Sequence, residues 1–113
     1  YQRTRKFSLS MSNPWFGEGS FAKGIGGPHV GKDKIWPLGI VMQILTTDDD
    51  DEIKSCLSML KKTHAGTGFI HESFHVNNPK DFSRAWFAWA NTLFGEMILH
   101  LAKHKPYLLA LKY

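Results

Sequence analysis

The segment from Ser83 to Lys103 constrains the fold more than any other, because apolar side chains recur on nearly every side of the helix that it predicts. Such a helix is expected to be buried on several faces, so other elements must surround it. Pro106 ends the pattern, and residues 107–111 are expected to begin a short terminal helix. The apolar positions are Trp86, Phe87, Trp89, Ala90, Leu93, Phe94, Met97, Ile98 and Leu101.

Two shorter helices are predicted upstream. The first begins near residue 35 with Pro37 in its first turn, where the missing N–H costs nothing, and its apolar residues predict a buried helix. The second begins at Thr46 or Thr47 as the cap, and the acidic run 48–52 then lies at the positive end of the helix dipole. Consecutive aspartates entering a helix point in different directions, so the run indicates a helix start rather than a calcium site.

Glycine and proline place the remaining residues in loops. Residues 1–29 carry repeated turn signals and predict a long irregular segment, in which Phe7 and Leu9 alternate as in a short strand or an extended arm. Residues 66–79 predict a second loop. The order helix, helix, loop, helix predicts an all-α protein, part of an α/α toroid in which paired helices form the wall and loops build the site.

The composition limits the kinds of binding partner expected for this chain. The 113 residues suit one small domain, and the net charge of +4 lies mainly near the two ends. No basic helix or aromatic and basic alternation indicates a nucleic-acid partner, and no run of roughly 20 apolar residues indicates a membrane partner. Cys56 is the single cysteine and is predicted to be a buried apolar residue.

The segment His71-Glu72-Ser73-Phe74-His75 fits the H-E-x-x-H zinc motif, in which two histidines one helical turn apart bind the metal and Glu72 is the general base. This interpretation predicts a metallopeptidase, with Glu96 as a third ligand. It requires a helix, however, and the flanking Gly66, Gly68 and Asn77-Asn78-Pro79 disfavour one.

A different interpretation comes from several ordered blocks that cover nearly all of the chain. Together they resemble the C-terminal part of glycoside hydrolase family 125, and several ordered blocks are more specific than a five-residue motif. The blocks are Asn13-Pro14, Gly24-Ile-Gly-Gly-Pro-His29, Ile35-Trp-Pro37, Gln43-Ile-Leu-Thr46, Asp49-Asp-Asp-Glu-Ile53, Thr63-His-Ala-Gly-Thr-Gly68, His71-Glu-Ser-Phe74, Trp86-Phe-Ala-Trp-Ala-Asn91 and Leu93-Phe-Gly-Glu96.

The resemblance implies an exo-acting α-mannosidase that removes terminal α-1,6-linked mannose with inversion, without a metal or other cofactor, on an (α/α)6 barrel. Its partner would be a mannose-containing glycan. The matching family block carries the proposed base, which implies that role for Glu72. An inverting glycosidase needs a second carboxyl, about 6.5–9.5 Å away, as the general acid. In the resembling enzymes that aspartate lies N-terminal to these residues.

Sugar recognition uses aromatic faces and fixed polar groups, a scheme that suits His29, Trp36, His71, Trp89 and Asn91. Each has a structural alternative. The tryptophans can be core residues, and the histidines can satisfy backbone groups. Glu72 can likewise be a structural hydrogen-bond acceptor, and the family often has an acid where His75 stands.

The chain does not begin with Met, and we expect it to be a piece of a longer protein. On this interpretation, residues 1–113 are a single partial domain, the C-terminal portion of a glycoside hydrolase catalytic domain, and the rest of the barrel lies upstream. A fragment with the base but without the acid is predicted to be inactive. A non-catalytic carbohydrate-binding remnant is the further alternative.

Overall fold

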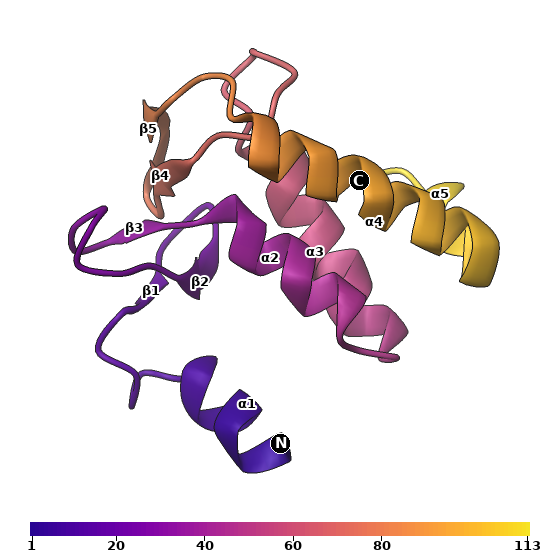
Figure 1. The fold of residues 1–113 in the computed structure, drawn as a ribbon, viewed down its shortest axis with the longest axis horizontal. Helices are drawn as coiled ribbons and strands as arrows, with labels where there is room; N and C mark the ends of the chain where they lie inside the picture. The colour runs from indigo at the N-terminus through magenta and orange to yellow at the C-terminus, as the bar shows by residue number, and fades with distance from the viewer.

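A computed structural model describes all residues from 1 to 113. Three longer helices dominate the chain, with short strands before the first of them and between the second and the third (Figure 1). The helices are α1 (Gln2–Ser8), α2 (Pro37–Leu45), α3 (Asp50–Lys62), α4 (Ala88–His104) and α5 (Pro106–Leu109). The strands are β1 (Phe16–Glu18), β2 (Lys23–Ile25), β3 (Lys34–Ile35), β4 (Ser73–His75) and β5 (Asn78–Ser83).

The strands form two small antiparallel sheets. One pairs β1 with β2, and the other has the order β3-β4-β5. In the second sheet Phe74 lies opposite Ile35 on one side and opposite Phe82 on the other. The β4-β5 pairing then breaks register, because His75 lies opposite Asn78. β5 therefore advances four residues where β4 advances one, which is a pronounced β-bulge.

The core lies between the helices and the three-stranded sheet. α2 contacts both α3 and α4, and the three-stranded sheet lies at one end of this helical layer (Figure 1). Ile40, Val41 and Ile44 of α2 are fully buried, as are Ile53 of α3 and Phe74 of β4. The predicted burial of the first helix is thus confirmed.

The all-α prediction is wrong. Five helices accompany two antiparallel sheets, so the chain has a mixed helix and strand architecture. The (α/α)6 barrel is not seen in these residues. The error arose in residues 66–83, where a loop over 66–79 and a helix from residue 83 were predicted but β4 and β5 form instead. Strands this short, interrupted by a bulge, carry almost no alternating pattern for a sequence to reveal.

Several element boundaries also differ from the predictions. Residues 2–8 form α1 rather than an extended arm, and the last long helix starts at Ala88 because β5 extends to Ser83. The cap of α3 is Asp49 rather than a threonine. Its Oδ1 accepts hydrogen bonds from the N–H groups of Asp51 and Glu52 at 2.9 and 3.4 Å, whereas the Thr46 hydroxyl bonds back to the last turn of α2. An aspartate carboxylate also gains from the helix dipole, which favours it as the cap.

α4 is less buried than its sequence predicts. Ala90, Met97 and Leu101 form the fully buried stripe, while Trp89 and Leu99 are 68% and 72% exposed. The expected burial on several faces is not met by contacts within these residues. None of the helices is long and apolar enough to cross a bilayer.

Cys56 lies on the inner face of α3. It is 1% exposed, and burial raises the pKa of its thiol to about 12. A thiol with this pKa is protonated at neutral pH and is a poor nucleophile. The prediction of a buried apolar cysteine is confirmed.

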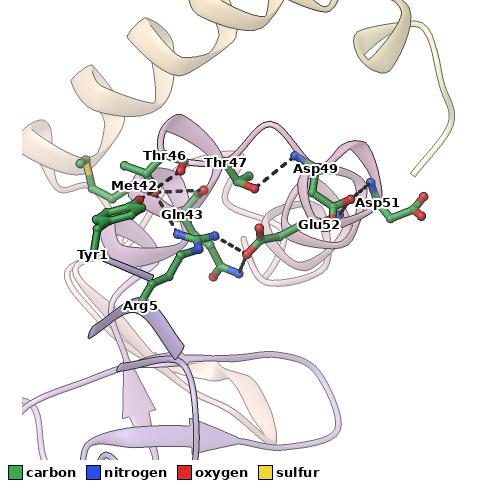
Figure 2. A network of polar contacts seen from close by, with 9 residues as sticks. All are labelled: Tyr1, Arg5, Met42, Gln43, Thr46, Thr47, Asp49, Asp51 and Glu52. Atoms are coloured by element: carbon green, nitrogen blue, oxygen red, sulfur yellow. Dashed lines mark hydrogen bonds and ion pairs between the residues drawn. The ribbon is translucent and has the colours of Figure 1, made fainter. Parts of the chain in front are cut away.

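A polar network joins α1 to α2 and α3 (Figure 2). Arg5 forms an ion pair with Glu52 at 2.5 Å, and the Gln43 amide donates a hydrogen bond to the same carboxylate oxygen at 2.6 Å. Both charged side chains are less than a quarter exposed. Burial alone would raise the pKa of Glu52, but donors at Thr47, Gln43 and Arg5 outweigh it and lower that pKa below its ordinary value of 4.5.

We expect Glu52→Gln to lower the free energy of unfolding by about 1 kcal/mol at pH 7. Because folding lowers the pKa of Glu52, its contribution is complete above the unfolded value and is lost as the pH falls through the folded pKa. The difference between variant and parent should therefore shrink as the pH falls below the ordinary pKa of 4.5 and vanish once it has passed the lowered pKa of the folded state. Urea unfolding of the complete natural protein at several pH values measures it.

Glu96→Gln is the matched control, since it makes the same exchange at an exposed position in the middle of α4, away from a helix end. Its unfolding free energy should follow that of the parent at every pH. A Glu52→Gln penalty that persisted undiminished in acid would contradict a charge-based contribution.

Candidate functional site

A pocket of about 250 Å³ collects four of the side chains predicted to act on a ligand. His29 comes from the loop after β2, Trp36 from the junction of β3 and α2, Glu72 from the residue before β4, and Trp89 from the first turn of α4. These residues are far apart in sequence. Leu38 and Phe87 complete the lining.

The glycine-rich block before His29 allows this arrangement. A Cβ at Gly26 would lie 2.1 Å from the carbonyl oxygen of Lys34, so no other residue fits there without moving the backbone. The close approach lets the Trp36 N–H donate to the Ile25 carbonyl at 3.0 Å. The loop that carries His29 is thereby held beside Trp36.

Glu72 is the acid among the residues that line this pocket, and its side chain is 21% exposed. Its N–H donates to the carbonyl of Ser83 at 3.2 Å, and its Oε1 accepts a hydrogen bond from the Ser83 hydroxyl at 3.0 Å. Its Oε2 lies 3.6 Å from Nε of Arg84. A partly exposed carboxylate with one fixed donor on one oxygen is suited to accept a proton on the other.

Arg84 is held in an unusual conformation next to Glu72. Its φ is 52°, in the left-handed region that costs a residue with a Cβ of order 1 kcal/mol. Its guanidinium carbon lies 5.7 Å from the centre of the Phe87 ring, which lines the pocket. No signal in the sequence places Ser83 or Arg84 at this site, because they reach Glu72 only through β5, which was not predicted.

The structure places His71 outside the pocket. The side chain is 1% exposed and stacks on Phe82, with ring centres 4.0 Å apart and planes 4° from parallel. Its Nδ1 bonds to the Ala85 carbonyl at 3.1 Å, while its buried Nε2 has no hydrogen-bond partner. His71 thus packs between the neighbouring strand and the approach to α4.

The zinc interpretation does not have the geometry it needs. The last three residues of the motif form β4, so His71 and His75 are not one helical turn apart. Nδ1 of His75 accepts the N–H of Asn77 at 3.1 Å. The suggested third ligand, Glu96, is exposed on α4, and no group of three or more His, Cys, Asp or Glu side chains is placed to bind a metal ion.

Asn91 likewise lies outside the pocket and connects α4 to the segment before Glu72. Its Oδ1 accepts the N–H of Ile70 at 3.0 Å. Its Nδ2 donates to the carbonyls of Ile70 at 2.7 Å and Phe87 at 2.8 Å. This amide satisfies three backbone groups and holds the chain two residues upstream of Glu72.

We expect Asn91→Asp to lower the free energy of unfolding by about 2–4 kcal/mol, because a carboxylate would face two carbonyl oxygens that now receive an N–H. Thermal and urea unfolding of the complete protein measure the loss. Asn78→Asp makes the same exchange at an exposed position whose side-chain oxygen only accepts a bond from the Lys80 N–H, so its stability should not change. A stable Asn91→Asp variant with only a raised KM would instead favour a substrate-binding amide.

Comparison with known proteins identifies the class. Residues 1–99 match the family described as metal-independent alpha-mannosidase (GH125). The Meiotically up-regulated gene 157 protein of Schizosaccharomyces pombe is 51% identical over 110 residues, which are 96% of this chain and 22% of that protein. A Streptococcus pneumoniae metal-independent α-mannosidase, solved as a non-productive substrate complex with α-1,6-mannobiose, has 44% identity and a TM-score of 0.87. The match to it covers 93% of this chain and 25% of that one.

These matches place the chain among the glycoside hydrolases. The chain spans about a fifth to a quarter of the length of the two relatives. It belongs to glycoside hydrolase family 125, the metal-independent α-mannosidases, which confirms the family resemblance seen in the sequence blocks.

Proposed function

We propose that this chain supplies the general base of an exo-acting, inverting α-mannosidase that removes terminal α-1,6-linked mannose. The observation that carries the proposal is the position of Glu72, which lies partly exposed in a pocket with Trp36 and Trp89. Indole rings offer apolar faces to the C–H groups of a sugar ring, and His29 offers a polar contact to its hydroxyls.

In the proposed mechanism Glu72 is the base that activates the attacking water molecule. In an inverting reaction the carboxylate takes a proton from water, whose oxygen bonds to the anomeric carbon while a carboxylic acid protonates the departing oxygen. Glu72 is the carboxylate on the pocket, so the acid comes from another part of the complete protein. Residues 1–113 would then be one portion of a catalytic domain, without turnover of their own.

The substrate assignment is supported by the relative from Streptococcus pneumoniae, which was solved with α-1,6-mannobiose and is 44% identical to this chain. His71 and Asn91 belong to the proposal as supports of the Glu72 segment rather than as sugar contacts, because both are committed to backbone groups. The partner remains a mannose-containing glycan.

The test is hydrolysis of α-1,6-mannobiose by the complete natural protein, followed by NMR of the first anomer released, with and without excess chelator. We expect β-mannose first, at a rate that the chelator does not change. Release of α-mannose would contradict inversion, and loss of activity with chelator would contradict a metal-independent reaction. A folded complete protein without hydrolysis would favour the binding remnant.

A further inference from the structure

We propose that Ser83 and Ser73 form an ordered hydrogen-bond chain that positions the Glu72 carboxylate and leaves one of its oxygens for the attacking water. The inference rests on the proposed function, since it takes Glu72 as the base. In it Ser83 is a direct positioning residue and Ser73 acts through Ser83.

The sheet register brings the two serines together. Ser73 is the first residue of β4, Ser83 is the last of β5, and they lie opposite each other in the antiparallel pair. Their hydroxyl oxygens are 2.6 Å apart. Ser73 is fully buried, so its hydroxyl has no access to water in place of this bond.

The direction of the chain follows from counting protons. A base is ionised before it reacts and has no proton to donate, so the Ser83 hydroxyl donates its one proton to Oε1 of Glu72 at 3.0 Å. The oxygen of Ser83 can then only accept from its neighbour. Ser73 must be the donor in the 2.6 Å contact, which fixes the order from Ser73 to Ser83 to Glu72.

This order makes the two carboxylate oxygens different. Oε1 is occupied by Ser83, whereas the nearest charged donor to Oε2 is Nε of Arg84 at 3.6 Å, beyond hydrogen-bond length. The Arg84 side chain is 65% exposed. Oε2 is therefore the oxygen that takes the proton of water, while the water oxygen bonds to the anomeric carbon and the leaving oxygen takes a proton from the acid.

The backbone contributes to the same arrangement. The N–H of Glu72 donates to the Ser83 carbonyl at 3.2 Å, so both the main chain and the side chain of Ser83 fix the residue that carries the base. Preorganised hydrogen bonds of this kind fix the geometry that a proton transfer needs. Removing the hydroxyl should therefore slow the chemical step more than it weakens binding.

The experiment is a double-mutant cycle on the complete natural protein with α-1,6-mannobiose as substrate. Ser83→Ala should lower kcat about 10- to 100-fold with KM changed less than about threefold, whereas Ser83→Thr, which keeps a hydroxyl, should restore most of it. Ser73→Ala should cost about 3- to 10-fold alone and little more when added to Ser83→Ala, because it acts through Ser83. Thermal unfolding of each variant shows that the fold is kept.

The outcomes separate this inference from the proposed function. Wild-type kcat in folded Ser83→Ala, with no activity in Glu72→Gln, would overturn the serine chain and leave the base in place. Activity retained by Glu72→Gln would overturn the proposed base itself. Losses from Ser73→Ala and Ser83→Ala that multiply would overturn the order of the chain. If Ser83→Ala does not fold, the kcat values of Ser83→Cys and Ser83→Thr are compared instead. The Ser83→Cys variant is expected to be the slower of the two, and equal kcat values would overturn the serine chain.

Discussion

Glu72→Gln is expected to lower kcat for α-1,6-mannobiose about a thousandfold in the complete natural protein, with little change in KM. Glutamine keeps the shape of the side chain and still accepts the Ser83 hydrogen bond, but it cannot take a proton from water. The loss should therefore appear in the chemical step. Initial rates over a range of substrate concentrations separate kcat from KM.

Glu96→Gln is the matched control for this substitution. Glu96 is exposed on α4 and does not line the pocket, so its replacement should leave kcat within about twofold. More than a tenth of the parental activity in a folded Glu72→Gln protein would contradict the role of Glu72 as the base. A thousandfold loss in Glu96→Gln would move that role to α4.

Phe74→Ala is expected to lower the free energy of unfolding by about 3–5 kcal/mol. Phe74 is fully buried in the middle strand of the three-stranded sheet, where it pairs with Ile35 and Phe82. Its removal leaves a cavity between the sheet and the helices, and the strand that follows Glu72 loses its main anchor. Urea unfolding of the complete protein, with the midpoint and slope determined together, measures the loss.

Phe7→Ala removes a phenyl ring from α1 at a position that is 52% exposed, and it should cost less than about 1 kcal/mol. Phe74→Leu keeps most of the buried volume and should lie between the two. A Phe74→Ala protein as stable as Phe7→Ala would show that the sheet does not depend on this ring.

The helices from α2 onward could be predicted because their signals are local. Pro37 marks the start of α2, the acidic run marks the start of α3, and Pro106 marks the end of α4. The strands could not. β4 has three residues and β5 pairs through a bulge, so the sheet depends on contacts with β3, about 40 residues upstream in sequence, rather than on an alternating pattern.

The part of the site that lies in the ordered sequence blocks could be predicted. His29, Trp36, Glu72 and Trp89 lie on one pocket, as a shared role requires. A motif does not reveal whether a polar side chain binds a ligand or a backbone group. His71 and Asn91 both bind backbone groups. Ser83 and Arg84 could not be predicted as site residues, because only the pairing of β4 with β5 brings them next to Glu72.

The bulge between β4 and β5 has a consequence for how this segment can change during evolution. Residues 79–81 lie between the pairs Phe74 to Phe82 and His75 to Asn78 and have no partner in β4. Insertions or deletions there can be absorbed within the bulge, whereas one added residue between Glu72 and Phe74 would turn alternate side chains to the opposite face. Homologues are therefore expected to vary in length within the bulge at residues 79–81 and to keep a constant length from Glu72 to Phe74.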